Sequence, residues 1–529
     1  MIVEWVKEDG ALVPKMKGVK ALDRETIAWA AQPGSQDYFL RCPILECCYE
    51  GTRGPGKTDA LLMDFNQHTG EDDRTDDDRK KGVPQMRGWG REWRGVLFRR
   101  TFPELEDVIE KSKKWFSQFQ PDAFFNSSRN YWRWPTGERL YFRPFPKASS
   151  YWTYHGHAYP WIGWEELGTW PDDSCYLPMF SCSRSTMPNM PRKIRSTTNP
   201  YGPGHNWVKA RFRLPVLPGH VRGQVIRDST DQSGFLEPPR VAIHGQLNEN
   251  KVLMCADPGY VSKLAAGAPN AAARQAWLFG GWDIVAGGMF DDVWYECRDY
   301  AVIPPFDVPA GWKIDRSFDW GDARPFATLW WAESNGEDLV FPDGSKKSTV
   351  RGDLFLIREY YGWNGKPNEG LRLLDYEIAQ NIVEREVKWG INGRVRPGPA
   401  DSSIFDDTNG SCVARGMSNV VRIGAKAYAG VRWIPANKGP GTRKQGWTQL
   451  RSYLNATIPS GRGPREKPGL FIVGPHCPQW LRTVPVLPRD EKDPDDVDSS
   501  TEDHVGDATR YRLVLPKRER RSGSTRGHY

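Results

Sequence analysis

The sequence predicts an α/β protein of two domains, and three observations support this prediction. A strand-like segment, 44–50, leads into a glycine-rich loop and then into a helix-like segment, 57–68. A Pro- and Gly-rich stretch, 301–311, is typical of a domain boundary. Beyond it, strand-like segments at 314–318, 326–333 and 353–361 precede helical ones, the order of a mixed α/β unit. The 529 residues are enough for both domains to bury a sizeable core.

Composition is that of a soluble globular protein. Hydrophobic residues make up 38% and charged residues 26% of the chain, and no stretch approaches the roughly 18 uninterrupted apolar residues of a membrane span. The N-terminus has neither a basic start nor an apolar run, so we expect no secretory signal and no membrane association. The nine cysteines are scattered and form no CxxC pair. This usage argues against a disulfide framework and a cysteine zinc site, and indicates a reducing cytosol.

The net charge of +7 is concentrated near the C-terminus, where five basic residues and one acid stand among the last fourteen residues. We expect residues 516–529 to form a basic flexible tail. The remaining body is close to neutral, so overall charge is a weak argument for nucleic-acid binding.

The glycine-rich loop predicts a phosphate site. Residues 51–58 read GTRGPGKT and match G-x-x-x-x-G-K-[ST] without a mismatch. The glycines let the backbone N–H groups face the phosphates, and the following helix adds a favourable dipole. We expect Lys57 to reach the β- and γ-phosphates and Thr58 to offer its hydroxyl to Mg²⁺. The expected ATP-binding set in this loop is Gly51, Thr52, Arg53, Gly54, Pro55, Gly56, Lys57 and Thr58.

A phosphate loop needs an acidic partner, and segment 158–166, AYPWIGWEE, ends in two glutamates. We expect Glu165 to hold the Mg²⁺ of ATP and Glu166 to orient or deprotonate the attacking water. Pro160 and Gly163 are unfavourable in a central strand, and an acidic pair in a solvated loop is the alternative. Arg53, inside the loop, either points at the γ-phosphate or is a surface arginine.

Three aspartates follow apolar segments in the C-terminal half: Asp319, Asp401 and Asp507. Each one alone is more often a turn former or a helix cap. Gathered in space, they would form a hard-oxygen site for two Mg²⁺ or Mn²⁺ ions, which suits phosphodiester hydrolysis. If 502–511 is helical, Asp503 or His504 is a further ligand or a supporting group, and the sequence does not choose between them.

A basic segment, 432–451, is the remaining candidate. Its loop carries Lys438, Arg443 and Lys444, with Trp433 and Trp447 on either side. This pattern indicates contact with DNA phosphates, and an ordinary basic loop over core tryptophans is the alternative.

Together these motifs resemble those of the large terminase subunit of tailed bacteriophages, from about residue 32 to residue 515. The segments that carry the resemblance are PGSQDYFL, GTRGPGKT, VLFRRTFPEL, WIGWEEL, STTNPYGPGHNWVKARF, LFGGWDIVAGGMF, FDWGDARPFATLWW, GPADSSIF and EDHVGDATRY. The resemblance implies an N-terminal P-loop (ASCE-type) ATPase domain over 1–300, with a lid and linker region at about 213–300. It implies a C-terminal RNase H-like (RuvC-type) nuclease domain over 301–515.

The resemblance also assigns roles to residues. It implies that Gln36 contacts adenine, that Arg53 is an arginine finger, and that Glu165 replaces the usual aspartate. Thr197, Thr198 and Asn199 would form a coupling motif that senses the γ-phosphate. Asp319, Asp401 and, most simply, Asp507 would be the metal ligands of the nuclease.

The function that the resemblance implies is that of a viral DNA-packaging motor. ATP hydrolysis would drive double-stranded DNA into a procapsid, and the metal-dependent endonuclease would cut the concatemeric genome. The implied partners are a small terminase subunit and the portal protein, on which the chain would form a homo-oligomeric ring. The implied location is the host cytoplasm and, transiently, the procapsid, but not the mature virion. The alternatives are a P-loop translocase or helicase without a nuclease, and an assembly adaptor without catalysis.

Overall fold

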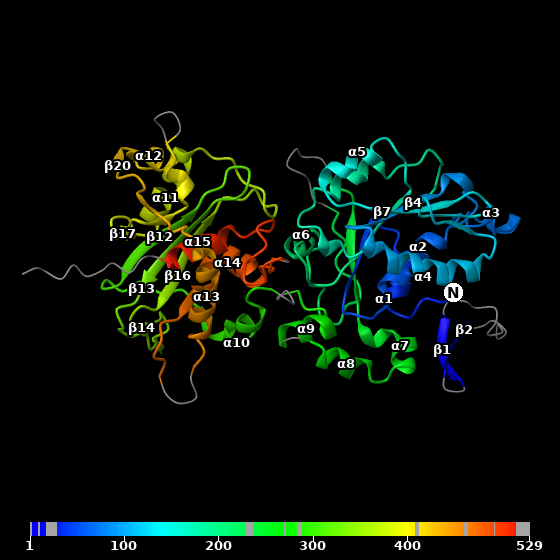
Figure 1. Ribbon diagram of the computed structural model, residues 1–529, viewed down its shortest axis with the longest axis horizontal. Coiled ribbons are helices and arrows are strands. Elements are labelled where there is room, and N and C mark those ends of the chain that lie inside the picture. Colours follow the sequence, from blue (N-terminus) through cyan, green and yellow to red (C-terminus); the bar gives the residue numbers. More distant parts are fainter. Residues whose placement is uncertain are drawn as a thin grey trace, which may run out of the picture. The chain divides into compact units, whose positions relative to one another are not determined.

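The computed structural model describes residues 3–8, 11–16, 29–227, 236–268, 271–282, 288–407, 412–459, 464–490 and 492–514. The basic tail expected at 516–529 lies outside these residues. The chain forms two compact units, Met1–Asp291 and Asp292–Tyr529 (Figure 1). The division does not fall at 301–311, because β11 (Val302–Ile303) pairs in parallel with β22 (Leu470–Val473) inside the second unit.

The first unit is built on an eight-stranded sheet of order β10-β3-β9-β8-β4-β7-β6-β5. Six neighbouring strands run parallel from β10 to β7, and β6 and β5 continue antiparallel at one edge. One strand, β9, lies between the strand that precedes the glycine-rich loop and the strand that precedes the two glutamates, which is the ASCE-type P-loop order. The strands are β3 (Glu46–Gly51), β4 (Arg94–Arg99), β5 (Phe124–Asn126), β6 (Tyr131–Arg133), β7 (Arg139–Pro144), β8 (Trp161–Trp164), β9 (Lys193–Thr197) and β10 (Arg240–Gly245).

Helices cover both faces of this sheet. On β3 the buried side chains alternate, so that Cys47 and Tyr49 pack under α1, α2 and α4, whereas Cys48 packs on the face of α6. The strand is therefore buried on both faces, as is usual in a parallel sheet covered by helices. The helices are α1 (Ser35–Leu40), α2 (Lys57–Asn66), α3 (Asp76–Lys80), α4 (Pro103–Phe119), α5 (Tyr151–Tyr154), α6 (His205–Phe212), α7 (Lys251–Ala256), α8 (Tyr260–Ala266) and α9 (Ala271–Phe279). A separate hairpin joins β1 (Val3–Glu8) and β2 (Ala11–Met16).

The second unit has a mixed sheet of order β11-β22-β16-β13-β12-β18-β21, with β17 also beside β12. Three strands form an antiparallel meander, and β18 and β21 join it in parallel on the far side of the first strand of the meander. This order is that of an RNase H-like fold, and the three predicted strands of this unit are confirmed as the meander. The strands are β12 (Lys313–Asp319), β13 (Ala327–Glu333), β16 (Leu354–Tyr361), β17 (Val395–Arg396), β18 (Gly398–Ala400) and β21 (Trp433–Pro435), with two small hairpins formed by β14 (Leu339–Val340) and β15 (Lys346–Lys347), and by β19 (Val421–Ile423) and β20 (Lys426–Tyr428).

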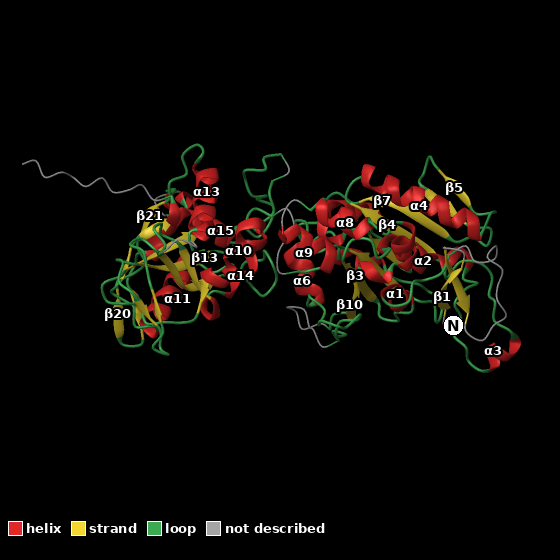
Figure 2. Ribbon diagram, turned by 90° about the horizontal axis from the view of Figure 1, so that it is seen from below, coloured by secondary structure: helices red, strands yellow, loops and turns green. Residues whose placement is uncertain are grey.

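Helices again lie on both faces (Figure 2). The apolar stripe of α11, including Ile378 and Ile382, packs on Phe318 and Trp330 of the meander. The opposite face is covered by α15, which in turn packs against α13. The helices are α10 (Asp291–Ala301), α11 (Asp375–Lys388), α12 (Val413–Met417), α13 (Thr442–Asn455), α14 (Pro478–Thr483) and α15 (His504–Leu513).

Two expectations from composition can be compared with these elements. Within the described ranges, none of the helices combines the length and the apolar character that crossing a membrane requires. All nine cysteines belong to the described residues, and each is a free thiol.

Candidate functional site

The glycine-rich loop joins β3 to α2 at the edge of the sheet where the parallel strands end. Gly51, Gly54 and Gly56 have φ angles of 123°, 88° and 84°, which residues with a Cβ rarely adopt. A Cβ on Gly51 would also lie 2.2 Å from the carbonyl oxygen of Gly245 on β10. The loop therefore requires glycine both for its curl and for its close approach to the neighbouring strand.

Lys57 and Thr58 begin α2 and point toward residues of the adjacent strands. The Lys57 Nζ donates to the carbonyl oxygen of Thr52 (2.5 Å) and to Oδ1 of Asn199 (2.8 Å). The Thr58 hydroxyl donates to Oε1 of Glu165 (2.5 Å). Burial lowers the pKa of Lys57 to about 8, against the nearby Glu166, which raises it. Burial raises the pKa of Glu165 to about 7, although Arg99 and the Thr58 hydroxyl lower it. The hydroxyl and the carboxylate are the hard oxygens that Mg²⁺ prefers.

The two glutamates directly follow β8, and Glu166 has an unusual backbone. Its φ of 53° and ψ of 57° are left-handed, a conformation that tends to occur at functional sites in residues other than glycine. Its Oε1 accepts a hydrogen bond from Nδ2 of Asn199 (2.8 Å). Thus one amide, that of Asn199, contacts both Lys57 and Glu166.

The expected coupling motif lies at the end of β9 and faces the acidic pair. The Thr197 hydroxyl accepts a hydrogen bond from the backbone N–H of Glu166 (3.2 Å), and the Thr198 hydroxyl accepts one from Gly168 (3.2 Å). With Asn199, these contacts join β9 to the turn after β8. The central position of β9 in the sheet brings all of these residues together.

Pro160 and Gly163 argued against a central strand within 158–166, but the strand that forms, β8, accommodates both residues. Pro160 precedes β8 and offers only its carbonyl, to the N–H of Lys193 (2.8 Å). Gly163 lies inside the strand, where the ring of Trp161 covers it. A Cβ at this position would come within 2.3 Å of that ring, so the contact requires glycine. The segment is a central, fully buried strand.

One further predicted residue, Gln36, contacts the loop from outside. Gln36, on α1, donates from Nε2 to the carbonyl oxygens of Pro55 and Gly56 (both 3.0 Å), and its Oε1 accepts from the N–H of Gln32 (2.8 Å). The Gln36 amide thus braces the glycine-rich loop.

Beside the loop, an apolar pocket of about 300 Å³ is lined by Gln246, Leu247, Asn248, Met254, Val261, Leu278 and Phe279.

Arg53 lies between two aromatic rings that the sequence did not single out. Its guanidinium carbon is 3.8 Å from the ring centroid of Trp277 on α9 and 5.4 Å from that of Tyr201. Tyr201 stands two residues after Asn199, so its place in the coupling motif is a signal that could have found it. Trp277 stands among unremarkable helix residues, and no sequence signal indicates it.

The second unit brings Asp319 and Asp401 side by side. Asp319 ends β12 and Asp401 follows β18, and these strands are parallel with Phe318 opposite Ala400. The Tyr511 hydroxyl lies 3.2 Å from Asp319 Oδ1 and 3.4 Å from Asp401 Oδ2. Burial raises the pKa of Asp319, although its hydrogen bond with His504 (3.1 Å) lowers it. Burial would also raise the pKa of Asp401, but Lys438, 2.7 Å from Oδ1, and the Ser403 N–H hold it below its usual value.

The start of α15 brings Asp503, His504 and Asp507 to the same place. Both oxygens of Asp507 accept hydrogen bonds from the Arg510 guanidinium (2.7 and 2.8 Å), and Arg443 also contacts them (3.3 and 3.2 Å). Asp503 Oδ2 accepts from Arg443 (3.0 Å). Burial and the neighbouring Asp507 raise the pKa of Asp503 to about 7. Of these two aspartates, Asp507 is thus the more completely engaged by arginine.

The donor chemistry of this cluster fits a hard divalent cation, since it offers several buried carboxylates near one another. In the part of the chain that the structure describes, however, no three His, Cys, Asp or Glu side chains form a metal-binding group. Cationic side chains from Lys438, Arg443 and Arg510 instead balance the carboxylates. The cluster therefore has the ligand type that Mg²⁺ or Mn²⁺ requires, but basic side chains are ion-paired with its carboxylates.

The basic segment 432–451 differs from the expected phosphate-contacting loop. Lys438 and Arg443 are ion-paired with the acids of the cluster, and Lys444 pairs with Asp493 (2.6 Å). Trp433 and Trp447, only 8% and 0% exposed, are core residues and cannot stack on bases. The alternative, a basic loop over core tryptophans, is what the structure shows.

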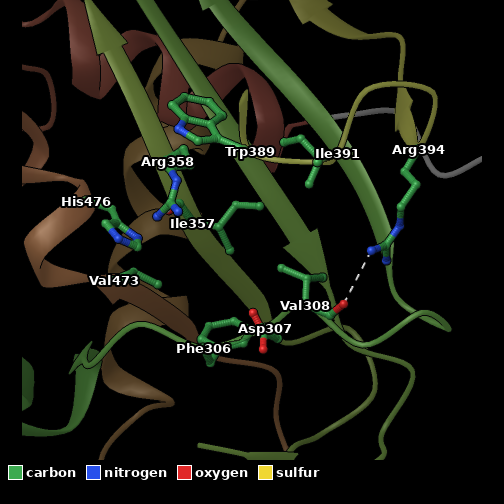
Figure 3. A pocket seen from close by; sticks show the side chains of 11 residues that line it. Phe306, Asp307, Val308, Ile357, Arg358, Trp389, Ile391, Arg394, Val473 and His476 are labelled. Atoms are coloured by element: carbon green, nitrogen blue, oxygen red, sulfur yellow. Dashed lines mark hydrogen bonds between the residues drawn. The ribbon is translucent and has the colours of Figure 1, made fainter. Parts of the chain in front are cut away.

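A separate pocket of about 210 Å³ lies beside the segment that leads into β12 (Figure 3). Asp319 stands at the other end of that strand. Arg358 lies 5.3 Å from the ring centroid of Trp389, and Arg394 donates to the carbonyl oxygen of Val308 (3.4 Å). None of the residues that line this pocket belongs to either candidate site.

The folds and sites define a protein that joins a P-loop ATPase fold to an RNase H-like nuclease fold. No family model and no curated protein matches the chain. Among solved structures, the large terminase of a thermophilic bacteriophage is 16% identical, with 91% of this chain and 98% of that chain covered and a TM-score of 0.34. The HK97 bacteriophage large terminase is 11% identical, with 92% and 95% covered and a TM-score of 0.37. The P22 large terminase nuclease domain is 15% identical, with 41% and 89% covered and a TM-score of 0.27.

These solved proteins belong to the group whose motifs the sequence resembles, so the expected resemblance is found again in the comparison of structures. At these identities and TM-scores we draw no residue's role from them. We argue function from the residues of the two sites.

Proposed function

We propose that this chain is a viral DNA-packaging ATPase and endonuclease. The observation that carries the proposal is the presence of both sites in one chain. The P-loop unit sets Lys57 and Thr58 against an acidic pair, and the RNase H-like unit gathers buried aspartates at the ends of β12 and β18.

In the ATPase, the backbone N–H groups of the glycine-rich loop and Lys57 would bind the phosphates of ATP. Thr58 and Glu165 would hold Mg²⁺, which neutralises phosphate charge when it is bound. Glu166 would orient and deprotonate the attacking water, since Asn199 fixes its carboxylate 2.8 Å from the amide. Gln36 would brace the loop beneath the nucleotide and lie near the adenine, for which the pocket beside Leu247 offers an apolar surface.

In the nuclease, we propose Asp319, Asp401 and Asp503 as the residues that would hold Mg²⁺ or Mn²⁺. These ions would activate a water and stabilise the leaving 3′-oxygen. Asp503 is preferred to Asp507 because the Arg510 guanidinium occupies both oxygens of Asp507. His504 would orient Asp319 through their 3.1 Å contact.

The motor function requires partners beyond these two sites. By resemblance, we propose that the chain acts on double-stranded DNA together with a small terminase subunit and a portal protein. A ring of copies of this chain on the portal of a procapsid, in the host cell, would then translocate the DNA. The solved structures of the large terminase from the thermophilic bacteriophage include one in complex with ADP, which agrees with the proposed nucleotide.

Plasmid cleavage in Mn²⁺ and in Mg²⁺ tests the nuclease. We expect the wild type to cut and Asp319→Asn to lose cutting by a factor of about 100 or more, since it removes a charge at the reacting centre. Asp322→Asn, an exposed aspartate three residues away, is the matched control and should cut like the wild type. Circular dichroism establishes that each variant is folded.

One observation favours a second candidate, a P-loop translocase without a nuclease: basic side chains already balance the aspartates at 401, 503 and 507. The same experiment separates the two functions. A folded wild type that hydrolyses ATP on DNA but cuts in neither metal would favour the translocase.

A further inference from the structure

Arg53 is held by residues of two different elements. The face of Trp277 on α9 lies 3.8 Å from its guanidinium carbon, and the ring of Tyr201 lies 5.4 Å away. A guanidinium is planar and weakly hydrated, so it stacks on aromatic faces better than an ammonium does. We call this arrangement of Trp277, Arg53 and Tyr201 the arginine cradle.

The backbone fixes the Trp277 side of the cradle. The N–H of Arg53 donates to the carbonyl oxygen of Trp277 (3.1 Å). Just beyond α9, Gly280 has a φ of 68°, and a Cβ there would lie 3.1 Å from Cα of Gly51. The C-terminal end of α9 is therefore seated directly on the glycine-rich loop.

The Tyr201 side of the cradle leads to the acidic pair. The Tyr201 hydroxyl accepts a hydrogen bond from Nδ2 of Asn199 (3.3 Å), and the same Nδ2 donates to Glu166 (2.8 Å). Oδ1 of Asn199 accepts from Lys57 (2.8 Å). A continuous series of contacts thus runs from α9 through Arg53 and Tyr201 to the residues that would contact phosphate and water.

We propose that Trp277 and Tyr201 are positioning residues for Arg53, and that through them α9 responds to the state of the nucleotide site. This inference rests on the proposed ATPase function. The aromatic faces set where the guanidinium lies, and Asn199 ties that position to Glu166. A shift of the Arg53 guanidinium toward a phosphate would remove its contact with the Trp277 ring and leave α9 held to the loop by the backbone alone.

Steady-state ATP hydrolysis by the full chain, in the presence of DNA, tests the positioning role. Trp277→Leu removes the aromatic face but keeps an apolar side chain, whereas Trp277→Phe keeps a ring. We expect Trp277→Leu to lower kcat by about 3- to 30-fold, the range that a cation–π contact corresponds to, with KM changed less than about 2-fold. Trp277→Phe should restore most of kcat. The matched control is Trp152→Leu, an exposed tryptophan of the same unit (71% exposed).

A double-mutant cycle distinguishes positioning from a general structural effect. If Trp277 acts through Arg53, Trp277→Leu should change kcat little in an Arg53→Ala background. Binding of a fluorescent ADP analogue and the Tm should stay close to those of the wild type. An equal loss of kcat in both backgrounds, or equal kcat for the Leu and Phe variants, would overturn the inference while leaving the ATPase intact. Absence of turnover in the wild type would overturn the proposed ATPase function and this inference with it.

Discussion

The Nζ of Lys57 lies 2.8 Å from Oδ1 of Asn199, although 142 residues separate them in the sequence. The other end of the same amide donates to Glu166. A single side chain on the turn after β9 thus contacts the lysine expected to bind phosphate and the glutamate expected to activate water. This arrangement depends on β9 lying between β3 and β8.

The first prediction concerns this amide. Asn199→Ala should lower kcat for ATP by about 100-fold, because Glu166 loses the contact that orients it and a displacement of about 1 Å is costly. The KM for ATP should change less than kcat. Steady-state ATPase assays measure both constants. The control is Asn206→Ala, on α6 of the same unit, and an equal loss in that variant would contradict the prediction.

The second prediction separates the two activities. Lys57→Ala should reduce ATP turnover by about 100-fold or more, because it removes the charge that faces the phosphates. Plasmid cutting in Mn²⁺ should remain within about 3-fold of the wild type, since the proposed nuclease residues all belong to the other unit. Both assays are run on the same folded preparation. Loss of both activities in a folded protein would contradict the two-site proposal.

The third prediction distinguishes two aspartates of α15. Asp503→Asn should abolish plasmid cutting with little change in the free energy of unfolding. Asp507→Asn should lower the free energy of unfolding by about 2–3 kcal/mol, because it leaves the buried Arg510 without its bidentate partner. Urea unfolding and plasmid cleavage of both variants test this. The reverse pattern would assign the ligand role to Asp507.

The fourth prediction concerns a buried ionic cluster under the P-loop sheet. Asp64, 0% exposed, contacts Nζ of Lys193 (2.8 Å) and Nε of Arg195 (3.2 Å). Asp64→Asn should lower the free energy of unfolding by about 3–5 kcal/mol, because two buried cations lose their counter-charge. Thermal or urea unfolding measures the effect. Asp107→Asn, in an exposed pair with Lys111, should change it by less than about 1 kcal/mol.

The fifth prediction is a pH dependence. Burial raises the pKa of Glu359 on β16 to about 7, against the N–H groups of Gln479 and Trp480, which lower it. Because the pKa of the folded state is above the unfolded value, the contribution of Glu359 to stability is complete below about pH 4.3 and is lost as pH rises through about 7. The free energy of unfolding of Glu359→Gln, relative to that of the wild type, should therefore rise as the pH increases from 5 to 8.

Urea unfolding of both proteins at pH 5 and pH 8 measures this relative gain. Glu337→Gln, an exposed glutamate of the same unit, is the matched control and should follow the wild type. A difference between Glu359→Gln and the wild type that is the same at both pH values would contradict the raised pKa.

Elements with local sequence signals could be predicted before the structure was known. The glycine-rich loop was recognisable because its glycines and its lysine stand at fixed spacing between a strand and a helix. The three strands of the second unit's meander were predictable because alternation and apolar runs mark strands within a few residues. The acidic candidates were also visible, since each follows an apolar segment.

Contacts between residues far apart in the sequence depend on the fold. It placed β9 between β3 and β8, and so brought Asn199 to Lys57 and Glu166. It set Lys438 and Arg443 against buried aspartates, where the sequence indicated contact with DNA. It also brought Trp277 against Arg53, a contact that no local pattern encodes. Charge balance and aromatic stacking depend on distances across the fold. Strand order and helix packing set these distances, whereas the spacing of residues along the sequence does not.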